Sequence, residues 1–160
     1  MKKAIVYSSL TGNTKKLAEA IKEALDEDIL VTKINDQAMD SEVIFVGGWI
    51  KGFAVTPDVS NFLKKLNNKK IFIFATAGYD YSEEFFNPIL KTFEAEINDT
   101  NEIIGQFICQ GKVSEPKQNN LKEVKPDYYN EIYNNLQRGL DHPNLDDINK
   151  LKNLVKSLNI

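Results

Sequence analysis

Cysteine and histidine are almost absent from this sequence, which contains one of each, Cys109 and His142. A single cysteine cannot form a disulfide within the chain, and this pair cannot supply the ligands of a usual zinc site. One histidine among scattered acids also gives no basis for a Ser-His-Asp catalytic set. We therefore expect no metal site and a cytoplasmic, reducing location. Cys109 ends an apolar segment and is interpreted as a buried, unreactive thiol.

Long hydrophobic runs and a strong net charge are also missing. No apolar segment approaches the roughly 20 residues of a membrane-spanning helix. The formal net charge is −3, from 20 Lys and Arg against 23 Asp and Glu. This value argues against nucleic acid as a partner, because proteins that bind it usually carry a basic patch. With 160 residues, 42% of them hydrophobic, the chain is expected to form one domain, residues 1–160, and to be a monomer.

Short apolar segments alternate with amphipathic ones along the chain, a pattern typical of a parallel sheet flanked by helices. Strands are predicted at residues 4–7, 29–34, 43–46, 71–75 and 103–109. Helices are predicted at residues 14–26, 57–66, 82–97 and from 145 onward, the second and last capped by Thr56 and Asn144. The third strand is expected to stop at Gly47-Gly48 and to lead into a loop. Pro88 is expected to bend or divide its helix.

Residues 111–143 depart from this pattern. The segment is polar, rich in Asn and Lys, and contains Pro116, Pro126 and Pro143. It predicts only a loose helical excursion around residues 128–138. His142, just before the last helix, is interpreted as a residue that fixes the loop.

The loop after the first strand carries the clearest functional pattern. Hydroxyl side chains surround Gly12, at Ser8, Ser9, Thr11 and Thr14. The loop leads directly into a helix N-terminus, where unpaired N–H groups and the helix dipole attract anions. It holds no Lys or Arg, and the chain contains neither Gly-x-x-x-x-Gly-Lys nor Gly-x-Gly-x-x-Gly. A neutral, hydroxyl-rich loop indicates a phosphate that is held permanently and not transferred.

This loop and its flanks resemble the amino-terminal signature of the flavodoxin family. The matching residues are Ile5, Val6, Tyr7, Ser9, Gly12, Thr14, Ala18 and Ile21. The resemblance implies non-covalent FMN, whose phosphate is held by Ser8, Ser9, Leu10, Thr11, Gly12, Asn13 and Thr14 through hydroxyls and backbone amides. It also implies an α/β fold with a doubly wound, five-stranded parallel sheet in the order 2-1-3-4-5 and helices on both faces.

The resemblance further implies that the loops after the third and fourth strands hold the isoalloxazine ring. The corresponding residues are Gly48, Trp49, Ile50, Lys51 and Gly52 in one loop, and Thr76, Ala77, Gly78, Tyr79 and Tyr81 in the other. Aromatic faces suit a flat, electron-poor ring. Trp49 occupies a common stacking position of the family, and Tyr79 or Tyr81 covers the other face, with Tyr81 at the better spacing.

Two positions depart from the family pattern. Ile50 stands where many flavodoxins have a glycine whose peptide turns over when the flavin is reduced, and a β-branched residue resists positive φ. Strict one-electron shuttling is therefore less well supported. Lys51 stands where many members are acidic, and a cation beside the ring would stabilise an anionic reduced flavin.

The predicted function is electron transfer between a flavin reductase and an electron-accepting redox enzyme. Two alternatives remain open on the same fold. One is a flavin enzyme that oxidises NAD(P)H or reduces quinones, and the other is a flavin-free binding or regulatory module.

Overall fold

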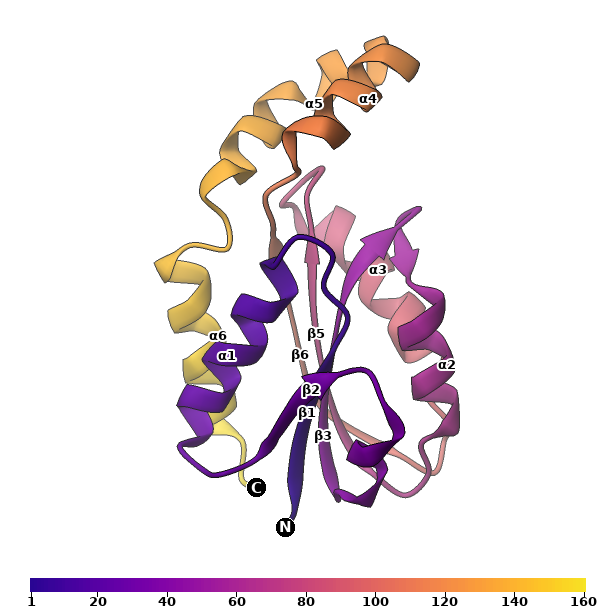
Figure 1. Ribbon diagram of the computed structural model, residues 1–160, viewed down its shortest axis with the longest axis vertical. Helices are drawn as coiled ribbons and strands as arrows, with labels where there is room; N and C mark the ends of the chain where they lie inside the picture. The colour runs from indigo at the N-terminus through magenta and orange to yellow at the C-terminus, as the bar shows by residue number, and fades with distance from the viewer.

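Five segments of the chain pair in parallel as a central sheet, in the order β2-β1-β3-β5-β6 (Figure 1). A computed structural model describes all residues, 1–160. The strands are β1 (Lys3–Tyr7), β2 (Leu30–Lys33), β3 (Val43–Lys51), β5 (Lys70–Ala77) and β6 (Glu102–Gln110). The predicted order is confirmed, because these are the five predicted strands taken in chain order.

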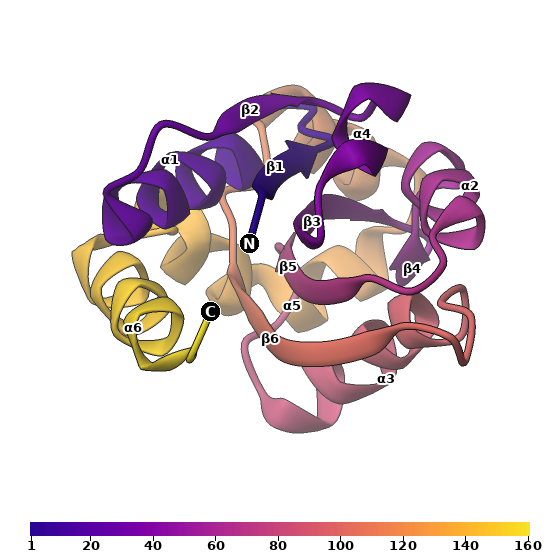
Figure 2. The same cartoon turned by 90° about the horizontal axis from the view of Figure 1, so that it is seen from below.

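Helices cover both faces of the sheet. Figure 2 shows α1 (Asn13–Leu25) and α6 (Leu145–Ser157) on one side, with α2 (Pro57–Lys65) and α3 (Glu83–Glu94) on the other. Alternation along β3 supplies both cores, since Ile44 and Val46 pack toward α2 and α3 while Phe45 packs toward α1 and α6. Burying each such side chain contributes roughly 1.5–3 kcal/mol. The central strands are thus fixed from two sides.

The expected end of the third strand at Gly47-Gly48 is wrong. β3 continues to Lys51, and the pairs Gly47↔Phe74, Gly48↔Ala75 and Trp49↔Thr76 extend its register with β5. The chain then turns back at Gly52 and Phe53 into β4 (Ala54–Val55), which pairs antiparallel with β3. A Cβ at Gly47 would collide with the Phe74 ring. The glycine therefore makes room for packing and does not break the strand.

Pro88 does not divide its helix, since α3 runs unbroken from Glu83 to Glu94. The Ser82 side chain caps the helix by accepting a hydrogen bond from the Phe85 N–H. Ile89 and Phe93 are buried against the sheet. Tertiary packing and the cap offset the hydrogen bond that proline cannot make.

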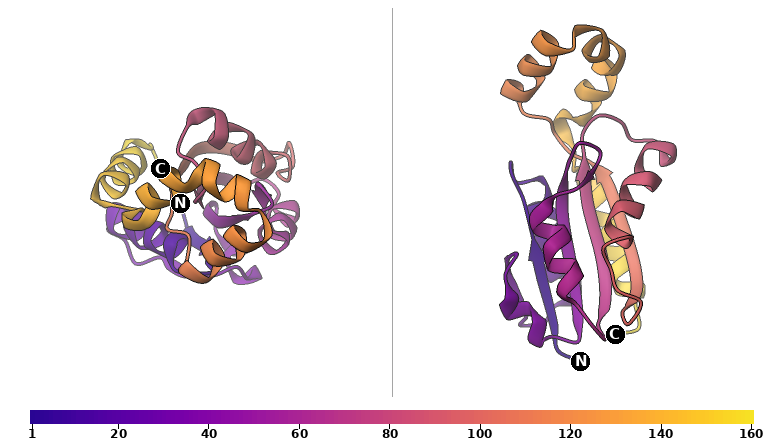
Figure 3. Two further views of the ribbon diagram at one scale, coloured as in Figure 1. Left: turned by 90° about the horizontal axis from the view of Figure 1, so that it is seen from above. Right: turned by 90° about the vertical axis from the view of Figure 1, so that its right-hand side faces the viewer.

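A helical hairpin lies beyond the carboxyl ends of the strands (Figure 3). It consists of α4 (Glu115–Val124) and α5 (Pro126–Arg138). The predicted helix at 128–138 is confirmed as part of α5, whereas α4 was not predicted because its sequence is polar and begins with Glu115-Pro116. The hairpin has its own small cluster of Val113, Ile132 and Leu136, against which Tyr79 of the sheet edge packs.

Short 3₁₀ segments complete the chain. η1 (Asp36–Asp40) follows β2, and η2 (Gly139–Asp141) joins α5 to the segment before α6. Asn144 caps α6 as expected, in a capping box with Asp147. None of the helices combines the length and the apolar character needed to cross a membrane.

Gly47→Ala should destabilise the protein by about 1–3 kcal/mol, because the added methyl group has no room beside Phe74. Gly48→Ala is the matched control, since its methyl group would meet Val59 Cγ2 at 3.1 Å, a much milder approach. Urea denaturation of both variants measures the difference. Equal stabilities for the two would contradict this account of β3.

Candidate functional site

The loop between β1 and α1 presents unpaired N–H groups at a helix N-terminus. Gly12 is the N-cap, with φ 96° and ψ −4°, a left-handed conformation that favours glycine. The Ser9 Oγ accepts hydrogen bonds from the N–H groups of Gly12 (3.1 Å) and Lys15 (3.4 Å). The N–H groups of Thr11, Asn13 and Thr14 donate to no acceptor within the chain. They are available to an anion, as the sequence pattern predicts.

The hydroxyls of this loop differ in their surroundings. Thr14 is fully buried, and its Oγ1 lies 3.1 Å from Thr76 Oγ1, which joins the loop to the end of β5. The Asp58 carboxylate accepts a hydrogen bond from the Thr56 hydroxyl and lies near Ser8. Burial alone would raise the pKa of Asp58, but hydrogen bonds from Ser8 and Thr56 outweigh it and lower that pKa. Thr11 is exposed and lines the cleft beside the loop.

A cleft starts at this loop and runs across the carboxyl edge of the sheet. Its polar part is lined by Leu10, Thr11, Asn13, Trp49, Thr76 and Ser114, together with residues 77–78 and 111–113. The side chains of Asn13 and Val113 pack directly against two glycines here, since a Cβ at Gly111 would lie 2.7 Å from Asn13 Nδ2 and one at Gly78 would collide with Val113. Asn13 Nδ2 also donates to the Lys112 carbonyl at 2.9 Å.

The other part of the cleft is apolar and has a volume of about 280 Å³. It adjoins the polar part, with which it shares the lining residues Ile50, Ala77, Gly78, Val113 and Lys117. The further lining residues are mostly aromatic or aliphatic: Phe53, Tyr79, Phe85, Leu121, Val124 and Tyr128, with Gly52, Asn120 and Lys125. One end of the cleft therefore suits an anion and the other a flat apolar group.

The aromatic side chains meet edge to face around the apolar part. Ring centroids are 6.0 Å apart for Phe53 and Tyr79, 6.1 Å for Phe53 and Phe85, and 6.0 Å for Tyr79 and Tyr128. Burial raises the pKa of the Tyr79 and Tyr128 phenols. Phe53 is 51% exposed and has φ 62°, a strained conformation for a residue other than glycine.

The predicted ring-contacting residues divide into those in the cleft and those outside it. Trp49, Ile50 and Tyr79 line it. Tyr81, favoured by spacing, lines neither part; it is 48% exposed and lies under the Arg138 guanidinium, 3.8 Å from its ring centroid. Lys51 is exposed on the β3–β4 hairpin and also lines neither part. Both residues therefore lie outside the two parts of the cleft, and their contact with a flavin ring stays a prediction.

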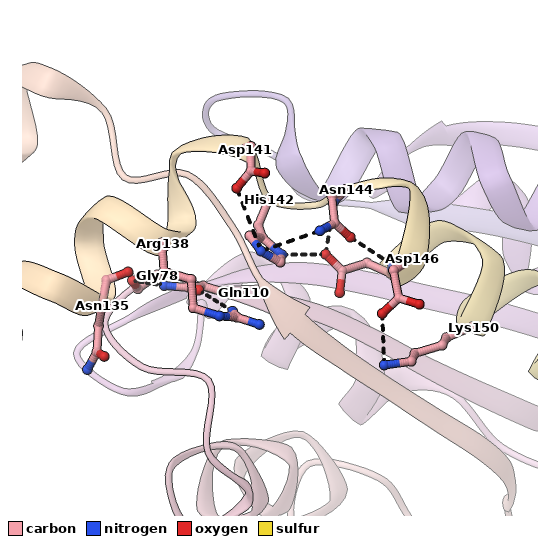
Figure 4. A network of polar contacts seen from close by, with 10 residues as sticks. Gly78, Gln110, Asn135, Arg138, Asp141, His142, Asn144, Asp146 and Lys150 are labelled. Atoms are coloured by element: carbon pink, nitrogen blue, oxygen red, sulfur yellow. Dashed lines mark hydrogen bonds and ion pairs between the residues drawn. The ribbon is translucent and has the colours of Figure 1, made fainter.

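A buried glutamine connects the loop after β5 with the helical hairpin (Figure 4). Gln110, 2% exposed, donates from Nε2 to the carbonyls of Gly78 (3.1 Å) and Asn135 (2.6 Å). Its Oε1 accepts a hydrogen bond from Arg138 at 2.7 Å. Every polar atom of the amide is thus used to hold the hairpin over the cleft.

His142 and Cys109 have the structural roles expected of them. His142 Nδ1 lies 2.7 Å from Asp147 Oδ2, and its carbonyl accepts from the Lys112 N–H at 2.9 Å, so it fixes the segment before α6 (Figure 4). Cys109 is buried. Burial and the nearby Asp147 charge raise the pKa of its thiol well above the usual value.

Several residues that line the cleft were not predicted from the sequence: Phe53, Phe85, Lys112, Val113, Lys117, Leu121, Lys125 and Tyr128. Most belong to the segment after β6, where the polar composition gave no signal of a binding surface. Phe53 lies within a predicted loop, where a large apolar side chain was the available sign, and Phe85 lies in the first turn of α3.

Comparison with known proteins bears on this site and fold. The family model described as a flavodoxin domain matches residues 4–156. The flavodoxin-like domain-containing protein BilS of Clostridioides difficile is 32% identical over 171 residues, which covers 100% of this chain and 97% of that protein. The protein of the same name from Clostridium symbiosum is 31% identical over 134 residues, 72% of this chain and 70% of that protein.

Two solved structures show the same fold. Oxidised flavodoxin 2 of Bacillus cereus has a TM-score of 0.62 at 18% identity, and covers 97% of this chain and 95% of its own. A flavoprotein of Lactobacillus acidophilus, solved in complex with FMN, has a TM-score of 0.54 at 16% identity, over 68% of this chain and 93% of its own. The expected flavodoxin-like fold is confirmed.

Gln110→Leu should destabilise the protein by about 1–3 kcal/mol, because it leaves two carbonyls and a guanidinium without their buried partner. Gln137→Leu, at an exposed position of α5, is the control and should change stability little. Urea denaturation of the two variants compares them. A Gln110→Leu variant as stable as the wild type would show that the hairpin does not depend on this amide.

Proposed function

The chain belongs to the flavodoxin domain family, and we propose that it binds FMN non-covalently and carries electrons between a flavin reductase and an electron-accepting redox enzyme. The observation that supports this most directly is the two adjoining parts of the cleft, with free N–H groups at one end and aromatic side chains at the other. FMN has the same polarity, with a phosphate at one end and a flat apolar ring at the other. The FMN complex of the Lactobacillus acidophilus flavoprotein, which shares the fold, agrees with it.

The loop residues fit a phosphate without any metal or Lys. In the proposed complex, the N–H groups of Thr11, Asn13 and Thr14 and the hydroxyls of Ser9 and Thr11 donate to its oxygens. Ser9 Oγ already accepts from two N–H groups, which leaves its own proton free to donate. These donors are positioned by the fold before binding.

The apolar part of the cleft fits the ring. Tyr79 would flank the ring there, Trp49 would contact it from the adjoining polar part, and Phe53, Leu121 and Tyr128 would exclude water from it. FMN supplies the redox chemistry, and the protein supplies binding, orientation and electrostatics. The half-exposed Phe53 leaves this end of the cleft open to a docking partner.

Thr11→Val should weaken FMN binding about tenfold, because one hydrogen bond to a charged group is lost at an exposed loop position. Thr100→Val is the matched control, since Thr100 is exposed and precedes β6, at the amino end of the sheet. Quenching of FMN fluorescence on titration with each protein gives the dissociation constants. A wild-type protein that takes up no FMN contradicts the proposal and favours the flavin-free module.

The FMN-loaded protein also distinguishes an electron carrier from a flavin reductase. A carrier loaded with FMN keeps its flavin absorbance when NADH or NADPH is added alone, and loses it when a flavin reductase is also present. Rapid bleaching by the pyridine nucleotide without a second protein would instead favour a flavin enzyme.

A further inference from the structure

We propose that Lys117 and Lys125 of the helical hairpin form a cationic rim on the ring end of the cleft and stabilise reduced flavin as its anion. The inference rests on FMN binding in this cleft, as proposed above. It concerns how the site sets the reduction potential and assigns that role to α4. On the sequence alone, Lys51 was the residue expected to act in this way.

Lys117 is placed to act on the whole ring end. Its side chain lines both the polar and the apolar parts of the cleft. Its Nζ lies 5.6 Å from the centroid of the Tyr79 ring, so the cation sits over an aromatic wall of the cleft. Lys125, at the end of α4, lines the apolar part from the same side.

No carboxylate balances these two cations inside the cleft. Neither part of it has Asp or Glu among its lining residues. Asp80 and Glu131 are close enough to Tyr128 to help raise its pKa, yet they line neither part. The charged residues that line the cleft are thus all cations: Lys117 and Lys125 at the apolar part, and Lys112 at the polar part only, each of them exposed.

Two cations beside the ring favour reduced, anionic flavin over oxidised, neutral flavin. The oxidised ring is neutral, and reduction by two electrons and one proton gives a ring anion; the electrons come from the reductase and the proton from solvent. A fixed cation lowers the free energy of the anion more than that of the neutral ring. Lys117 and Lys125 thus raise the midpoint potential, and they affect the affinity for oxidised FMN less.

Lys117→Met tests this in the FMN-loaded protein. We expect the preference for reduced over oxidised FMN to fall about tenfold, which lowers the midpoint of the two-electron couple by about 30 mV. Lys117→Arg keeps the charge and should retain the wild-type midpoint. Lys122→Met is the matched control, because Lys122 is on the same helix but lies over Tyr129, 5.9 Å from its centroid, and lines neither part of the cleft.

Redox titration against dyes of known potential gives the midpoints, and fluorescence titration gives the affinity for oxidised FMN. A Lys117→Met protein that holds FMN at the wild-type midpoint overturns the inference and leaves the proposed function standing. A wild-type protein that binds no FMN overturns both. If Lys117→Met no longer holds FMN, Lys125→Met takes its place, and an unchanged midpoint there overturns the inference.

Discussion

Parallel pairing of β1, β3 and β5 determines where the functional segments of this protein lie. Parallel strands end at the same edge of a sheet, so the loop after Tyr7, the extension of β3 and the loop after Ala77 meet there. The Thr14–Thr76 hydrogen bond and the Trp49↔Thr76 pair join the three segments directly. Apolar clusters on both faces fix the strands, so the edge is rigid enough to position the loops.

The helical hairpin changes the character of this edge. An open doubly wound sheet offers only a crevice beyond its strands. Here the segment after β6 passes close to Asn13 and to Gly78, and a Cβ at Gly78 would collide with the Val113 side chain. The Gln110 amide then joins α5 to the loop after β5, through hydrogen bonds to the carbonyls of Asn135 and Gly78. The crevice thereby becomes a cleft that is lined by aromatic side chains and covered by α4, the helix that contains Lys117.

The two ends of the cleft differ in the kind of group that would interact with a negative charge. At the loop between β1 and α1, the donors are backbone N–H groups, and hydrogen bonds help to lower the pKa of the nearby Asp58 carboxyl. Fixed dipoles of this kind suit a charge that is always present. At the ring end, the charged groups are lysines on α4. A cation suits a group whose charge changes with its redox state, since it favours one state over the other.

The sequence by itself determined the order of strands and helices, the expected fold and the loop from Ser8 to Thr14. These depend on patterns within a few residues: apolar alternation, helix caps and a hydroxyl-rich turn before a helix. Gly47-Gly48 misled the interpretation, because a glycine that makes room for Phe74 looks the same in sequence as one that ends a strand. Only the tertiary structure placed Tyr79 in the cleft and Tyr81 under Arg138, and brought α4 with Lys117 over the ring end. Those positions depend on contacts between residues far apart in the chain, such as Gln110 with Asn135 and Tyr79 with Tyr128, which no local pattern encodes.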